Sequence, residues 1–322
     1  MTTTVTEQFS SESRVDALAS SGVEQPARVR PRRRLPRRQK RPPMVPLEPW
    51  RKTGALISLT VCALTAWVFL YLVVFSAVQH ARSQHELYST FRAELALATG
   101  PAGGLIKPGV PVAVLTIPNA HIHNEVVVEG TTSGITRAGP GHLRTTPLPG
   151  QPGISIIFGR SQMFGGPFGH VGSLHPGDAI IATTDQGVFQ FRVSGVRHAG
   201  DPLPDPVATG GGRLTLVTSD GGWTAKHVVY VDATLHGSAA ADPGGRINAL
   251  APTEKFMAGE TEPLTYCEVF LWLQLLVVLS CGIPWLRHKW GLWQVWLVGT
   301  PALIAVIWGT SSTAVRLLPN LL

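Results

Sequence analysis

The chain has 322 residues, 44% of them hydrophobic, and a formal net charge of +7 that is unevenly distributed. Residues 1–52 carry 12 Lys and Arg against 5 Asp and Glu, whereas residues 80–263 carry 12 against 14. A uniformly basic, nucleic-acid-binding chain is therefore excluded. The 3 cysteines, at positions 62, 267 and 281, lie in or next to apolar runs, so residues 80–263 offer no disulfide and no thiol nucleophile.

Residues 1–52 are predicted to be a disordered, basic, cytoplasmic tail. Nine basic residues and no acidic residue lie between Arg28 and Arg41, among several prolines. A segment of this composition cannot bury a core. A polybasic segment beside a membrane span is typical of an orientation signal that attracts anionic lipid. We therefore expect membrane lipids, and no nucleic acid, as partners of the tail.

Three apolar runs predict transmembrane helices. The first, residues 53–79, includes 24 consecutive uncharged residues, which is enough to cross a bilayer of about 30 Å. It is too long and starts too far from the N-terminus for a signal peptide. The second and third predicted helices are residues 264–286 and 290–315.

Basic residues beside these runs predict the orientation in the membrane. The positive-inside rule puts Arg28 to Lys52 and Arg287 to Lys289 in the cytoplasm. Residues 80–263 then lie outside a plasma membrane that the chain crosses several times. Small residues in the third helix favour close helix packing, so we expect the second and third helices to bind other cell-envelope membrane proteins. The alternative is that this hairpin is only a second anchor.

The region between the first and second spans is predicted to hold a stalk (80–107), a β-domain (108–236) and a linker (237–263). Short apolar runs separated by Gly, Pro and Asp indicate a sandwich or a closed barrel. The predicted strands are residues 112–117, 125–129, 154–158, 178–183, 188–194, 213–218 and 227–235.

Short motifs follow one another through residues 108–236. They are IP at 117–118, VVVEG at 126–130, GPGH at 139–142, PGQPG at 149–153, GRS at 159–161, PF at 167–168, GD at 177–178 and TLVTS at 215–219. In this order they resemble the sortase family, most closely its actinobacterial class E branch. The resemblance implies a mainly β protein: a closed eight-stranded β-barrel outside the membrane, joined here to three transmembrane α-helices. It also implies a family that cleaves a sorting signal in secreted proteins and joins it to a cell-wall amine.

The resemblance further implies three catalytic positions, and this chain departs from the family at each. The family has a nucleophilic Cys at the end of the TLxTC strand, an acid-base His in a GHR motif and an oxyanion-stabilising Arg on the next strand. Here Ser219 stands at the Cys position and Arg160 at the His position. Either Lys226 or His227 stands at the Arg position.

These substitutions weaken the expected chemistry. A thiol is partly ionised near neutral pH, whereas a serine hydroxyl needs a base during attack. Arg160 cannot be that base, because a guanidinium stays protonated. We therefore expect no catalytic residue, and predict a catalytically inactive binding or scaffold subunit in cell-envelope assembly. The alternative is a transpeptidase or hydrolase that uses Ser219 as nucleophile, with His142 or His227 as base.

The altered positions also predict a ligand site. Arg160 and Lys226 together would favour an anionic ligand, because guanidinium binds carboxylate and phosphate through paired hydrogen bonds. A secreted peptide or glycan is the other ligand that we expect. No cofactor is expected, and no metal, since His121 and His123 have no accompanying carboxylate pair.

Overall fold

The computed structural model describes residues 49–220, 222, 226–287, 289 and 291–322. The chain divides into two compact units, Met1–Thr53 and Gly54–Leu322, and the features below belong to the second, apart from the first residues of helix α1. The predicted basic tail lies almost entirely outside the described residues.

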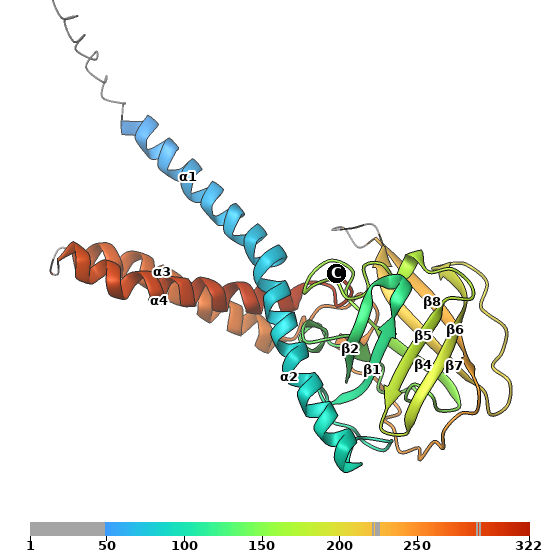
Figure 1. Ribbon diagram of the computed structural model, residues 1–322. Coiled ribbons are helices and arrows are strands. Elements are labelled where there is room, and N and C mark those ends of the chain that lie inside the picture. Colours follow the sequence, from blue (N-terminus) through green and yellow to red (C-terminus); the bar gives the residue numbers. More distant parts are fainter. Residues whose placement is uncertain (1–48, 221, 223–225, 288, 290) are drawn as a thin grey trace, which may run out of the picture. The chain divides into compact units, whose positions relative to one another are not determined.

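A continuous helical segment precedes the β-domain in the chain. It comprises α1 (Pro49–Leu70), a short π-helix (Tyr71–Phe75) and α2 (Ser76–Leu97), drawn from blue to teal in Figure 1. Its apolar part is long enough to cross a membrane. The predicted stalk is therefore helical over most of its length.

Helices α3 (Pro263–Arg287) and α4 (Leu292–Ala314) lie side by side as a hairpin (Figure 1). Both contain stretches long and apolar enough to cross a membrane. Glycines on α4 let α3 approach closely, because a Cβ atom at Gly309 would lie 2.7 Å from the Trp272 ring and one at Gly299 would lie 3.2 Å from Ile283.

Gly309→Val should therefore weaken the hairpin. We expect the free energy of unfolding to fall by about 1–3 kcal/mol, because the added methyl groups overlap the Trp272 ring. The control is Gly282→Ala on α3, where a Cβ atom would meet open space and the change should stay within about 0.5 kcal/mol. Thermal unfolding in detergent micelles measures both, and equal loss in the two variants would contradict this packing.

The β-strands close into a barrel in the order β1-β2-β3-β4-β7-β8-β6-β5 (Figure 1), which confirms the predicted closed barrel of eight strands. All seven predicted runs form strands, and β3, of 2 residues, is the addition. The description "mainly β" fits this domain, whereas the whole chain is also rich in helix. The strands are β1 (Pro111–Ile117), β2 (Ile122–Glu129), β3 (Gly141–His142), β4 (Gly153–Phe158), β5 (Ala179–Thr184), β6 (Gly187–His198), β7 (Gly212–Asp220) and β8 (His227–His236).

Near Ser219, strand β7 packs against other parts of the chain on both of its faces. Leu214 and Leu216 point into the barrel and belong to its main apolar core. Because side chains alternate along a strand, Val217 and Ser219 lie on the opposite, outer face. Val217 packs there in a second cluster with Leu321. The C-terminal region thus covers the outer face of β7 only at Val217 and Ser219.

Two further segments dock on the barrel. Gln84 of α2 receives a hydrogen bond from Val126 N (2.7 Å) and donates to Ala138 O (2.8 Å), which ties the helix to β2. In the predicted linker, the Phe256 ring stacks on Phe158 with centroids 4.7 Å apart. The segment after β8 therefore forms part of the wall around the outer face.

Candidate functional site

Ser219 lies near the end of β7 and is 5% exposed. Its hydroxyl donates to the backbone carbonyl of Leu321 at 2.8 Å. The Ser161 hydroxyl lies 2.7 Å from Ser219 Oγ, and the Ser161 amide donates to the same Leu321 carbonyl at 3.0 Å. Two hydroxyls and one amide thus converge on a single peptide carbonyl.

The Gly159–Ser161 turn brings Ser161 to this position. Strand β4 runs parallel to β7, and Gly159 N donates to Val217 O at 2.9 Å, so the chain leaving β4 follows the end of β7. A Cβ atom at position 159 would lie 2.2 Å from the Phe168 ring, which explains the glycine. Ser161, rather than Arg160, is the side chain of this turn that hydrogen-bonds Ser219.

Arg160 is fully buried. Its hydrogen bonds go to backbone carbonyls and a serine hydroxyl rather than to a carboxylate. Its Nη2 donates to the carbonyl and hydroxyl oxygens of Ser133 at 2.7 and 2.9 Å. Its Nη1 donates to Pro319 O at 3.3 Å, and the guanidinium lies 5.1 Å from the Phe164 ring centroid. Arg160 therefore joins the loop after β2 to the C-terminal segment.

The surroundings of Arg160 lower its pKa, but not enough to make it a base at neutral pH. Burial, and then the positive charge of Arg137, lower the pKa of Arg160 to about 9, whereas Glu260 acts in the opposite sense. At pH 7 only about 1% of such a group is neutral. Burial likewise lowers the pKa of Arg137. The site thus contains one fully buried guanidinium group, that of Arg160, and one half-buried group, that of Arg137.

The two candidates for the family's Arg position, Lys226 and His227, lie at the start of β8. Ser219 pairs with Val228, and Asp220 pairs with His227. Lys226 precedes the strand, and both its side chain and that of His227 are exposed. The side chain facing Ser219 across the ladder is therefore apolar.

His142 is buried and hydrogen-bonded elsewhere. Its Nδ1 lies 2.8 Å from Glu129 Oε2, and its Nε2 lies 2.9 Å from Pro147 O. Strand β4 lies between β3 and β7, so about 10 Å of sheet separates the strands of His142 and Ser219. The structure thus brings together Ser219 and Ser161, whereas His142 is bonded elsewhere and His227, the other histidine considered as the base, is exposed opposite Asp220.

The remaining histidines lie in other surroundings. His198 Nε2 lies 3.5 Å from Asp220 Oδ2 at the surface, and the rings of His121 and His170 meet edge to face with centroids 5.9 Å apart. Within the described residues, no group of three or more His, Cys, Asp or Glu side chains is arranged to hold a metal ion.

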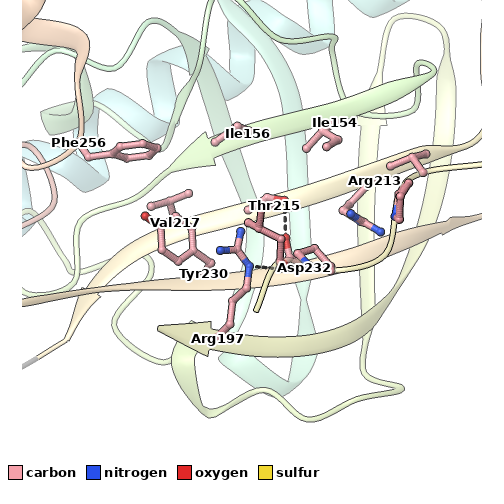
Figure 2. Close-up of a pocket in the computed structure, with 13 residues that line it drawn as sticks. Ile154, Ile156, Arg197, Arg213, Thr215, Val217, Tyr230, Asp232 and Phe256 are labelled. Atoms are coloured by element: carbon pink, nitrogen blue, oxygen red, sulfur yellow. Dashed lines mark hydrogen bonds and ion pairs between the residues drawn. The ribbon is translucent and has the colours of Figure 1, made fainter. Parts of the chain in front are cut away.

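A groove lies along the outer face of β7, over Arg213, Thr215 and Val217 (Figure 2). It encloses about 380 Å³, and its walls are largely apolar. On its floor, Asp232 accepts hydrogen bonds from Thr215 Oγ1 and Arg197 Nε, each at 2.6 Å. Its lining residues are Ile154, Ile156, Arg197, Leu203, Pro204, Pro206, Val207, Arg213, Thr215, Val217, Tyr230, Asp232 and Phe256.

Sequence reasoning missed the partners that fill the site, namely Ser133, Ser161 and the segment 318–322. Ser161 is the third residue of the GRS motif. Because it directly follows the family's His position, the sequence could have indicated that it lies near Ser219. Leu318–Leu322 carries no motif or periodic pattern, and its contact with Ser219 spans 102 positions of sequence.

Residues 115–236 match the family model of the sortase domain. This match confirms, for residues 115–236, the sortase domain that the motifs predicted. No curated relative matches the chain.

Solved sortases are similar in fold to about half of the chain. A sortase D5 transpeptidase of Clostridium perfringens is 22% identical and covers 48% of this chain and 99% of its own, with a TM-score of 0.39. Sortase E from Streptomyces avermitilis is 24% identical over 47% of this chain and 100% of its own, with a TM-score of 0.35. Sortase C-1 from Actinomyces oris is 18% identical over 47% of this chain and 99% of its own, with a TM-score of 0.34.

Proposed function

We propose that this chain is a catalytically inactive, sortase-like protein of the plasma membrane that acts as a binding or scaffold subunit in cell-envelope assembly. The observation that carries the proposal is the hydrogen bonding of Ser219. Its hydroxyl donates to Leu321 O, and its other neighbour is the Ser161 hydroxyl. Among the described residues, no imidazole or amine is hydrogen-bonded to Ser219 Oγ. A serine without a base does not attack a peptide at a useful rate.

The membrane arrangement belongs to the same proposal. Three helices have the length and composition of spans, and the basic residues beside them favour a cytoplasmic N-terminus. The barrel would then face the cell envelope. The proposed partners are other envelope membrane proteins, bound through α3 and α4, and a secreted peptide or glycan in the groove along β7.

A labelling experiment tests whether the site is inactive. The full chain in detergent is incubated with a fluorescent serine-reactive phosphonate and, separately, with a quenched sorting-signal peptide. We expect no adduct on Ser219 and no cleavage above the rate of Ser219→Ala. The same assays are run on a chain shortened to residues 1–317, because the bound C-terminal segment alone could block access. An adduct or turnover that Ser219→Ala abolishes, in either chain, would overturn the inactive assignment.

A complementation experiment tests the scaffold role. In cells from which the gene is deleted, we expect Ser219→Ala to restore the cell-envelope phenotype as fully as the wild-type chain does. A chain lacking residues 263–322 should not restore it, because the proposed partner-binding hairpin is gone. Equal complementation by both variants would contradict binding through the hairpin.

A further inference from the structure

The segment Leu318–Leu322 is bound beside Ser219 as a peptide ligand would be. Asn320 and Leu321 are fully buried, and Leu322 is 8% exposed. Successive backbone carbonyls meet donors of the barrel: Pro319 O meets Arg160, Asn320 O meets Thr136 Oγ1 at 3.2 Å, and Leu321 O meets Ser219. Leu322 O accepts from Met163 N at 3.2 Å.

Side chains of the segment are also recognised. Asn320 Nδ2 donates to the carbonyls of Thr131 and Lys255 at 2.7 and 3.0 Å. Leu321 packs against Phe158 and Val217, and these contacts adjoin the open groove of about 380 Å³ that Val217 also lines. The segment therefore lies next to the Val217 end of the groove, and the groove itself stays open.

The membrane hairpin holds this segment through ion pairs at its base. Arg316, two positions before Leu318, lies 2.6 Å from Glu260 Oε2 and 3.0 Å from Glu268 Oε2, and Glu268 belongs to α3. Val315 and Leu322 share an apolar cluster with Tyr71, Met163 and Phe164. Any shift of α4 along α3 would thus be transmitted to the segment beside Ser219.

We propose that Leu318–Leu322 is an exchangeable internal ligand that covers Ser219 beside the groove, and that displacement of the α3–α4 hairpin releases it. An extended peptide with a leucine side chain at the Leu321 position then takes over the same hydrogen bonds from Ser161, Ser219 and Arg160. This inference rests on the proposed binding function of the same groove and adds its regulation.

Thiol accessibility tests the closure. Cys62, Cys267 and Cys281, which are exposed, are replaced by Ala, and Ser219→Cys is introduced. The rate of modification by a polar maleimide is measured in the full chain in detergent, in the chain shortened to residues 1–317 and in the full-length variant Leu321→Asp. We expect the thiol at position 219 to react at least about tenfold faster in the two altered chains, because the side chain is uncovered.

The matched control is Val188→Cys on β6, where the side chain is 65% exposed, and its rate should be the same in all three chains. Equal rates at position 219 in all three chains would overturn closure by the segment. Faster reaction at position 188 as well would show general unfolding and would also overturn the assignment.

A fluorescent peptide with the sequence of residues 316–322 tests exchange. We expect it to bind the shortened chain at least about tenfold more tightly than the full chain, since the internal segment competes for the same site. A peptide of reversed sequence should bind neither. Equal binding of the two peptides would overturn exchange. Phosphonate labelling of Ser219 would instead refute the inactive assignment alone, so the two proposals fail in different experiments.

Discussion

Arg160→Ala is expected to lower the free energy of unfolding of the barrel by about 3–5 kcal/mol. The side chain is among the largest that are fully buried, so its removal leaves a cavity. The carbonyls of Ser133 and Pro319 also lose their donors, and a buried carbonyl without a partner costs about 1–3 kcal/mol. Urea titration in detergent, followed by proteolysis of the unfolded barrel, measures the loss.

Arg160→Met separates the two contributions, because methionine fills most of the volume but donates no hydrogen bond. We expect it to be more stable than Arg160→Ala by about 1–2 kcal/mol. An Arg160→Ala chain as stable as the wild-type chain would show that the guanidinium does not anchor the C-terminal segment.

The pH dependence of the wild-type chain relative to Arg160→Met supplies a second readout. With a native pKa of about 9, below the ordinary value of 12.5, Arg160 binds fewer protons in the native than in the unfolded state between these values. Stability from this group therefore rises with pH in that window. We expect the wild-type chain to gain about 1 kcal/mol over Arg160→Met between pH 8 and pH 10.

Asp232→Ala is expected to lower the free energy of unfolding by about 2–3 kcal/mol. The carboxylate is 2% exposed and accepts hydrogen bonds from Arg197 and Thr215 (Figure 2). Its removal leaves a buried hydroxyl and a partly buried guanidinium without acceptors. Thermal unfolding in detergent measures the loss.

Two controls accompany this change. Asp232→Asn keeps an oxygen for Thr215 but removes the charge, so about half of the loss is expected. Asp205→Ala removes an exposed carboxylate from the loop between β6 and β7 and should leave stability within about 0.5 kcal/mol of the wild-type value. A loss at position 205 equal to that at position 232 would contradict a specific role of the buried pair.

The strands were predictable because each is a short apolar run bounded by turn residues. Strand β3 was not, because its 2 residues carry no periodic pattern and pair only through backbone. The helical continuation through Tyr71–Phe75 into α2 was only partly foreseen, since a helix-compatible polar stretch does not show where it docks. Gln84 makes that docking specific by hydrogen-bonding β2 backbone.

Only the part of the site that lies within the sequence motifs was predictable. TLVTS placed Ser219 near a strand end, and GRS placed Arg160 beside the site. The actual partners of these side chains, Leu321 O and Pro319 O, are backbone atoms of a distant segment. Backbone acceptors have no residue signature, so no pattern in the sequence identifies them. Likewise, only the pairing of β7 with β8 shows that Val228 faces Ser219.

One apolar cluster determines which form of the protein is suitable for purification. It consists of Tyr71, Met163, Phe164, Val315 and Leu322. A soluble fragment cut to the strands alone would present Met163 and Phe164 to water and leave Ser219 uncovered, which invites aggregation and artificial reactivity. Assays on such a fragment would report on a surface that the intact chain does not expose. Micelles or nanodiscs that retain the helices are the appropriate setting for functional measurements.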